Sequence, residues 1–343
     1  MGNTMQRIVL KAYARGNPKA SDFELQEVDI PQAGEREILV KTLWLALDPL
    51  CRFAIDEVRL SGATHLALGD VMYGATVSEV IESNHPDYAV GDIVEDRSGW
   101  CEYAVLTPDD CDYRGPPRII DAALAPVSTA LGVLGMPGQT AYSAMVDIAK
   151  VQAGETVVIS AAAGAVGTIA GQIAKILGAR VVGIAGGPDK CQRLLELGFD
   201  AAADYKADNF SEQLALALPE GAEVYLDNVG GEVTLAVLPL LKRGARMPMC
   251  GFIAYYGVGE EGPGPDRLPG FYRQIMAKGL EIKGFAGFMG GQRALDQLAQ
   301  WIDQGKLRYP ETIVEGLQAA PEAFAKVFES NAFVGKLLVK VAG

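Results

Sequence analysis

The sequence contains few of the residues that most often hold metal ions. Only two of its 343 residues are histidine, His65 and His85. The five cysteines stand singly at positions 51, 101, 111, 191 and 250, and no C-x-x-C pair occurs. This spacing argues against a structural zinc site and against a redox dithiol. Scattered cysteines are typical of a reducing compartment, so we expect a cytoplasmic protein with no bound metal.

Long apolar runs and an excess of positive charge are also missing. No apolar segment is long enough to span a membrane, and the first seven residues lack the apolar stretch of a secretory signal. The net charge of −13 argues against nucleic acid or an anionic membrane as a partner. We therefore expect a small-molecule ligand, and an anionic one would need a local group of cations.

The pattern of short segments divides the chain into two kinds of region. Residues 8–30, 38–47 and 70–107 alternate between apolar and polar positions and are bounded by Gly, Pro and Asp, as antiparallel strands are. After Gly154, apolar strands alternate with helices, which is typical of a doubly wound parallel sheet. Short strands return near residues 312–316 and 335–341.

A chain of this length exceeds one ordinary core, so we expect two domains. We expect a small β-barrel domain formed by residues 1–127 and 306–343. The predicted Rossmann domain, residues 128–305, is inserted between these two parts. The fold class predicted from the sequence is therefore α/β, with a barrel and a doubly wound parallel sheet.

The most informative stretch, residues 157–167, reads as a buried strand, a glycine-containing turn and the start of a helix. Ala162 stands where the G-x-G-x-x-G pattern has its first glycine, and Gly164 and Gly167 occupy the other two positions. Backbone N–H groups at such a helix start can hold a pyrophosphate. The alternative is a packing turn that binds nothing, but the surrounding strands and helices favour a dinucleotide site. Its candidate residues are Ala162, Gly164, Ala165, Val166 and Gly167.

The end of the second strand of this region distinguishes NAD from NADP. Enzymes that bind NAD usually place Asp or Glu there, but Ala185 is followed by Gly186 and Gly187. Lys190 and Arg193 come shortly after. A cation beside a strand end without a carboxylate suits a ribose 2′-phosphate, so the sequence predicts NADPH. The alternative is that both cations are solvated charges on an ordinary helix.

Motifs along the whole chain resemble the zinc-independent medium-chain dehydrogenase/reductases. They include L-A-L-D-P-L-C-R at 45–52, L-G-M-P-G-Q-T-A-Y at 134–142, Y-L-D-N-V-G-G-E at 225–232 and N-A-F-V-G-K at 331–336. The most similar branch comprises the leukotriene B4 12-hydroxydehydrogenases (prostaglandin reductases), plant alkenal reductases and bacterial curcumin reductases. The resemblance implies a GroES-like β-barrel domain, a Rossmann domain and a homodimer. It also implies NADPH-dependent reduction of a carbon–carbon double bond conjugated to a carbonyl group.

The resemblance also implies roles for individual residues. Lys190 and Tyr205 match positions that flank the 2′-phosphate, Asn228 matches the asparagine beside the nicotinamide half, and Asn331 matches a contact of the pyrophosphate region. Tyr256 falls close to the nicotinamide and the substrate. The remaining expected cofactor contacts are Gly186, Cys250 and Phe252, and the expected substrate contacts are Leu50, Tyr256 and Phe285.

Tyr256 is our candidate catalytic residue. Without a metal, the negative charge that develops on the carbonyl oxygen needs a hydroxyl donor, and Tyr256 could supply one. The alternative is a tyrosine that only packs. Two departures from the family pattern, Leu50 in place of tyrosine and the sequence Ala254–Gly257 in place of S-x-Y-N, leave the substrate open.

Several alternatives remain at this point. The aromatic residues Tyr255, Phe271, Tyr272, Phe285 and Phe288 either line a pocket for hydrophobic enals and enones or belong to the core. Cys51 and His65 could be the remnant of a zinc site, although neither has the sequence context of a ligand, and we interpret both as non-ligands. The alternatives to an enone reductase are an NADPH-dependent quinone oxidoreductase and an NADPH-binding protein without catalytic activity.

Overall fold

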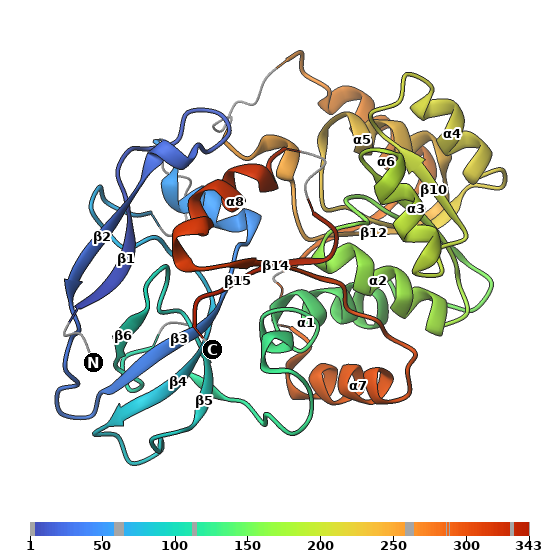
Figure 1. The fold of residues 1–343 in the computed structure, drawn as a ribbon. Coiled ribbons are helices and arrows are strands. Elements are labelled where there is room, and N and C mark those ends of the chain that lie inside the picture. The colour runs from blue at the N-terminus through green and yellow to red at the C-terminus, as the bar shows by residue number, and fades with distance from the viewer. Residues whose placement is uncertain are drawn as a thin grey trace. The chain divides into compact units, whose positions relative to one another are not determined.

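The structure is a computed structural model that describes residues 4–57, 65–111, 115–257, 264–285, 287, 289–329 and 333–342 (Figure 1). It divides into two compact units. One consists of Met1–Leu131, Glu311–Ala332 and Leu337–Gly343, and the other of Gly132–Pro310 and Phe333–Lys336. The chain therefore leaves the first unit, builds the second and returns to the first, and it then contributes residues 333–336 to the second unit before it ends in the first.

The first unit is built from antiparallel strands. Strands β1 (Thr4–Leu10) and β2 (Phe23–Asp29) pair as a ribbon. A second sheet has the order β14-β15-β3-β4-β5-β7, and β6 also pairs with β3. Its strands are β3 (Ile38–Ala46), β4 (Thr76–Ser83), β5 (Ile93–Asp96), β6 (Tyr103–Leu106), β7 (Arg118–Ile119), β14 (Glu311–Glu315) and β15 (Lys336–Lys340).

The central strand β3 explains how distant parts of this unit come together. It pairs antiparallel with β4 and with β15, so the last strand of the described chain lies beside an early one. Alternate residues of β3, Ile38 and Val40, pack with Val80 and Val94 in one apolar cluster. This alternation is the period of two that the sequence predicts for half-buried strands. Two short helices, η2 (Pro49–Ile55) and α8 (Ala320–Val327), also belong to this unit.

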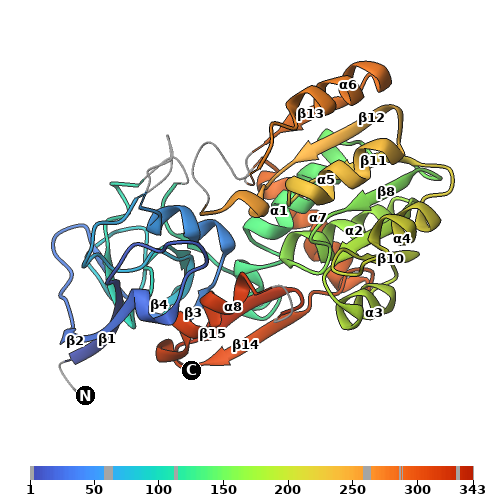
Figure 2. The ribbon, with the colours of Figure 1, turned by 90° about the horizontal axis from the view of Figure 1, so that it is seen from above.

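The second unit contains a parallel sheet with the strand order β10-β9-β8-β11-β12-β13, part of which can be followed in Figure 2. Each strand pairs in parallel with its neighbour. The strands are β8 (Thr156–Ile159), β9 (Arg180–Ala185), β10 (Ala201–Asp204), β11 (Ala222–Leu226), β12 (Leu241–Met249) and β13 (Glu281–Gly284). This is the order of a Rossmann fold, so the predicted fold class is confirmed.

Helices cover both faces of this sheet. Val157 and Ile159 pack with residues of α1 (Met136–Tyr142), α2 (Ala165–Ile176) and α7 (Gly291–Asp303). Val158 points to the opposite face and packs with residues from a second set of helices. These are α4 (Phe210–Ala217), α5 (Gly231–Val237) and α6 (Leu268–Lys278). Because strand order reverses between β8 and β11, their carboxyl ends mark the crevice where such sheets bind ligands.

One predicted loop is shorter than the sequence suggests. The glycine- and proline-rich composition of residues 257–270 predicts a long loop, but Leu268 begins helix α6 and Pro269 occupies its first turn. Proline is well suited to this position because it has no N–H to leave unsatisfied. Residues 258–263 of the segment lie outside the described part of the chain. In the described part, no helix combines the length and the apolar character needed to cross a bilayer.

Candidate active site and cofactor site

The turn between β8 and α2 is formed by small residues in close contact. Ala161 adopts a positive φ of 46°, and the buried N–H of Ala162 donates to the carbonyl of Ile184 at 2.9 Å. A Cβ on Gly167 would lie 2.5 Å from the Ala161 carbonyl oxygen, so only glycine lets α2 approach the turn. A Cβ on Gly164 would meet the same oxygen at 3.3 Å. Gly164 is the N-cap of α2, and Ala165 and Val166 form its first turn, so the predicted pyrophosphate residues share one helix start.

A late segment of the chain completes this turn. The N–H of Gly335 donates to the carbonyl of Ala163 at 2.8 Å, and Gly335 forms a parallel bridge with Gly164. Gly335 has a φ of 75°, and a Cβ there would lie 1.9 Å from the Pro310 carbonyl oxygen. Glycine is therefore required for this close approach. The predicted contact Asn331 lies outside the described residues.

The ends of β9 and β10 bring the predicted 2′-phosphate residues together. Lys190 is a half-buried residue in the first turn of α3 (Pro188–Glu196). A Cβ on Gly186 would lie 2.9 Å from the Tyr205 ring, so the ring packs against the Gly186 backbone. Burial, and then the charge of Lys206, lower the pKa of Lys190. Arg193, in contrast, pairs with Glu196 of its own helix at 2.9 Å.

A fully buried carboxylate, Asp227, organises the end of β11. Its Oδ1 accepts hydrogen bonds from the N–H groups of Val229 and Gly230, both at 2.9 Å. The Tyr225 hydroxyl donates to Oδ1 at 3.0 Å, and the Thr234 hydroxyl donates to Oδ2 at 2.6 Å. The Ser160 hydroxyl also donates to Oδ1 at 3.2 Å, and five donors on two oxygens suit an ionised carboxylate, which only accepts. Asp227 therefore fixes the D-N-V-G-G turn that follows β11.

Asn228 connects the ends of the two strands at which the order reverses. Its backbone N–H donates to the Ser160 hydroxyl at 2.9 Å, and its Nδ2 donates to the Ser160 carbonyl at 2.6 Å. Its Oδ1 accepts from the Cys250 thiol at 2.6 Å. Burial, with a smaller effect of Asp227, raises the pKa of the Cys250 thiol to about 12, so this thiol remains a donor. One amide hydrogen and one lone pair of Asn228 remain for a ligand.

Tyr256 follows a short helix, η6 (Ile253–Tyr255), and is half-buried. Its ring meets the Phe252 ring edge to face, with centroids 5.4 Å apart. Burial raises the pKa of Tyr256 to about 12, Cys250 adds to this effect, and a backbone hydrogen bond with Phe252 opposes it. The phenol is therefore neutral near pH 7 and can donate a hydrogen bond to a ligand oxygen.

The remaining aromatic candidates have different surroundings. The Tyr255 ring packs over Gly230, where an added Cβ would be 3.1 Å away. Phe285 is half-buried and packs against the core between the sheet and α1, α2 and α7. Phe271 is half-buried and packs against the apolar cluster on the opposite face of the sheet, as its interpretation as a core residue predicts. Tyr272 is exposed on α6, and Phe288 lies outside the described residues.

Leu50 belongs to the first unit. It lies in helix η2 and is 38% exposed, so its side chain is accessible. Its contact with a substrate stays a prediction. The same helix contains the buried Cys51.

Sequence reasoning missed four polar residues at or just after the carboxyl ends of the parallel strands. They are Ser160, Asp204, Lys206 and Asp227. A polar residue directly after a buried strand at the reversal of strand order is the signal that could have found Asp227 and Ser160. Lys206 is next to the predicted Tyr205 and could have been recognised as a second cation.

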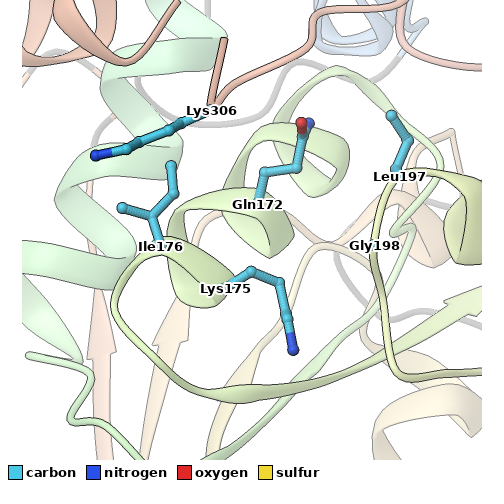
Figure 3. Close-up of a pocket in the computed structure, with 6 residues that line it drawn as sticks. All are labelled: Gln172, Lys175, Ile176, Leu197, Gly198 and Lys306. Atoms are coloured by element: carbon cyan, nitrogen blue, oxygen red, sulfur yellow. The ribbon is translucent and has the colours of Figure 1, made fainter. Parts of the chain in front are cut away.

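A hollow of about 330 Å³ lies elsewhere on the second unit (Figure 3). Its lining residues are Gln172, Lys175, Ile176, Leu197, Gly198 and Lys306. The side chains of Lys175 and Lys306 extend in different directions in this view. Lys175 pairs with Asp200 at 2.9 Å. Since the second half of α2 lies toward the amino ends of the strands, this hollow is separate from the crevice at their carboxyl ends.

The described residues do not fit a zinc site. Among them, no three or more His, Cys, Asp or Glu side chains are grouped so that they could hold a metal ion. His65 Nε2 lies 2.8 Å from the Asp56 carbonyl, and His85 Nε2 lies 3.2 Å from Asp109. Both histidines therefore have structural partners. All five cysteines are described, and none forms a disulfide.

Comparison with known proteins finds a matching family model for part of each unit. Residues 6–112 match the family model described as the N-terminal domain of oxidoreductase, and residues 165–304 match the model described as zinc-binding dehydrogenase. The NADPH-dependent curcumin reductase of Escherichia coli is 43% identical over 98% of this chain and 97% of its own length. The NADP-dependent 2-alkenal reductase of Nicotiana tabacum is 35% identical over 98% of this chain and 97% of its own length.

A solved structure gives the same result. The crystal structure of CurA from Vibrio vulnificus in complex with NADPH is 40% identical and superimposes with a TM-score of 0.90. The superposition covers 98% of this chain and 99% of that one. Both the sequence and the fold are therefore similar along the whole length.

Proposed function

This chain belongs to the zinc-independent medium-chain dehydrogenase/reductases, and we propose on this basis that it reduces carbon–carbon double bonds conjugated to a carbonyl group with NADPH. Its substrates are α,β-unsaturated aldehydes and ketones. The observation that carries the choice of cofactor is the end of β9, where Ala185 and Gly186 replace a carboxylate and Lys190 lies in the following helix turn. A carboxylate at this position would repel a 2′-phosphate, whereas a lysine attracts it.

The proposed cofactor contacts occupy the carboxyl edge of the parallel sheet. The first turn of α2, which begins at Ala165 after the N-cap Gly164, offers N–H groups to the pyrophosphate, and Gly167 lets that helix close on the turn. Asn228, held by Ser160 and Cys250, offers its remaining amide hydrogen near the reversal of strand order. Phe252 and Asn331 are further proposed contacts. Bound NADPH supplies the hydride for the reduction.

Tyr256 is the proposed hydrogen-bond donor to the substrate carbonyl. As the double bond is reduced, negative charge develops on that oxygen, and a positioned neutral hydroxyl stabilises it. The half-burial of Tyr256 and its pKa of about 12 keep the proton on the phenol at neutral pH. Leu50 and Phe285 are the proposed apolar substrate contacts.

The test is NADPH oxidation measured against enals, enones including curcumin, quinones and simple ketones. We expect turnover of enals and enones, with mass spectrometry of the product showing the gain of two hydrogens. Turnover of quinones alone would contradict the enone assignment and favour a quinone oxidoreductase. NADPH binding without any turnover would favour a non-catalytic protein.

A homodimer is the proposed assembly. Strand β13 ends the sheet order, so its outer edge has no partner strand within the described chain. Nearby helix α6 exposes Leu268, Tyr272 and Met276, the last at 83%. Open strand edges and exposed apolar side chains favour association. Sedimentation velocity over a range of concentrations should show a dimer, and a monomer at all concentrations would contradict it.

The proposed location is the cytoplasm, because the cysteines are dispersed and none is in a disulfide. Fractionation of the source cells with an antibody to this chain checks it. Recovery outside the cytoplasmic fraction would contradict it.

A further inference from the structure

The carboxylate of Asp204 joins the two loops that follow β9 and β10. These strands pair in parallel with Asp204 beside Ala185, so their carboxyl ends are level. Asp204 Oδ1 accepts the N–H of Gly187 at 2.8 Å and the N–H of Lys206 at 3.0 Å. One oxygen atom therefore holds the start of α3 and the residue after Tyr205 at a fixed separation.

Two further contacts make this arrangement rigid. The N–H of Tyr205 donates to the Ala185 carbonyl at 3.1 Å, and the Tyr205 ring packs on Gly186. Gly187 has a φ of 93°, a left-handed conformation that glycine adopts without strain. The backbone on both sides of the Tyr205 ring is thus determined before any ligand binds.

The same arrangement holds two lysines near each other. Lys190 is half-buried in the first turn of α3, and Lys206 is close enough for its charge to affect Lys190. Two like charges held together repel, and an anion between them relieves that repulsion. In a protein with a net charge of −13, a local pair of cations selects where an anion binds.

We propose that Lys206 is a second ligand of the ribose 2′-phosphate of NADPH, and that Asp204 is the positioning residue that holds Lys206 and the start of α3 around it. The proposal rests on the proposed function, which supplies NADPH as the cofactor. NADH lacks this phosphate, so neither residue contributes to NADH binding. Asp204 thus serves NADP specificity, although it is a carboxylate at a strand end.

The experiment compares dissociation constants for NADPH, NADH, adenosine 2′-phosphate and adenosine 5′-phosphate by isothermal titration calorimetry. The variants are Lys206→Met, Lys206→Arg, Asp204→Ala and Asp204→Asn in the full chain. Lys306→Met is the matched control, because it removes one lysine from the same unit at the separate hollow. Thermal unfolding of each variant shows whether it is folded.

We expect Lys206→Met to raise the dissociation constants of NADPH and adenosine 2′-phosphate by about tenfold. The dissociation constant of NADH should change by less than about twofold. Lys206→Arg should retain most of the affinity, because it keeps the charge. Asp204→Ala should raise the dissociation constant of NADPH by about five- to tenfold. Asp204→Asn should bind NADPH nearly as tightly as the wild type, because its Oδ1 still accepts both N–H groups. Lys306→Met should leave all four ligands unchanged.

If Lys206→Met lost the same affinity for NADPH and NADH, or lost affinity for neither, the role of Lys206 would be overturned. An Asp204→Asn variant as impaired as Asp204→Ala would overturn the positioning role. Failure of the proposed function is recognised separately: the wild type would then not prefer NADPH over NADH, or would reduce no enal or enone. If the wild type does both and Lys206→Met keeps the NADPH preference, only this inference fails.

Discussion

Two buried aspartates at strand ends, one in each unit, differ in how many of their carboxylate oxygens accept hydrogen bonds. Asp227 follows β11 of the parallel sheet and is 0% exposed, and Asp96 ends β5 of the antiparallel sheet and is 2% exposed. Asp227 accepts hydrogen bonds on both carboxylate oxygens. Asp96 accepts on Oδ1 from Thr76 at 2.6 Å and from Ser98, whereas its Oδ2 has no hydrogen-bond partner in the described part of the chain.

The difference shows what a charge needs inside a protein. The turn after β11 offers two backbone N–H groups to Asp227, so its charge is compensated without water. Asp96 has too few donors, and burial raises the pKa of its carboxyl although Ser98 and Thr76 oppose this effect. A proton on its Oδ2 removes the cost of a partly compensated charge. The first arrangement fixes a turn at the carboxyl edge of the parallel sheet, and the second leaves a carboxyl group in the core.

The largest test of this contrast is Asp227→Ala. It removes the acceptor of two backbone N–H groups and three hydroxyls, so we expect the free energy of unfolding to fall by about 3–5 kcal/mol. NADPH binding should also be lost as the D-N-V-G-G turn loosens. Urea unfolding and calorimetry measure the two effects. Asp96→Ala is the matched variant, and an equal cost for both would contradict the contrast.

Lys190→Ala tests whether the carboxyl edge of the parallel sheet is a ligand site. Removing this cation should weaken the binding of NADPH by about ten- to a hundredfold and leave the binding of NADH nearly unchanged. Because burial and Lys206 lower the pKa of Lys190, its charge is lost at a lower pH than that of an ordinary lysine. The dissociation constant of NADPH in the wild type should therefore rise as the solution becomes alkaline. Equal losses for the two cofactors would contradict this assignment.

Tyr256→Phe tests a buried group that stays protonated, the phenol proposed as a hydrogen-bond donor to the substrate. We expect kcat for an enone to fall by about ten- to a hundredfold, because one donor to the developing charge is lost while others remain. The dissociation constant of NADPH should stay unchanged. With a pKa of about 12, the phenol should produce no inflection in the pH–rate profile between about pH 6 and 9. Unchanged turnover would reduce Tyr256 to a packing residue.

The smallest effect is expected for Asp96→Asn, which resembles the protonated carboxyl. A raised pKa in the folded state means that the wild type loses stability as pH rises from the unfolded pKa through the folded one. The variant lacks this dependence, so its stability relative to the wild type should increase with pH by at most about 1.4 kcal/mol per unit. Denaturation at several pH values checks this. A relative stability that decreases with pH would show that Asp96 is ionised in the folded state.

The sequence predicted what depends on local pattern. The end of β9 at Ala185, the start of α2 after Gly164 and the return of strands near residues 312 and 336 all follow from apolar periodicity and glycine placement. Asp204 escaped notice because one of its partners, the N–H of Gly187, comes from the loop after β9, whose position depends on strand register. Asp227 escaped notice although most of its partners are local, because its burial depends on its place in the assembled sheet. Whether Phe271 lines a pocket or packs against the core depends on where α6 packs, which its own sequence does not reveal.

The bridge between Gly164 and Gly335 has a consequence for biosynthesis. The ribosome makes the β8–α2 turn long before it reaches Gly335. The rest of the second unit up to Pro310, and residues 311–332 of the first unit, are made in between. The sheet can assemble around its own core during translation, since domains generally fold as units as they emerge. The turn nevertheless acquires its last backbone partner only when residues 333–336 have been added, so a nascent chain stalled earlier presents the β8–α2 turn without that partner.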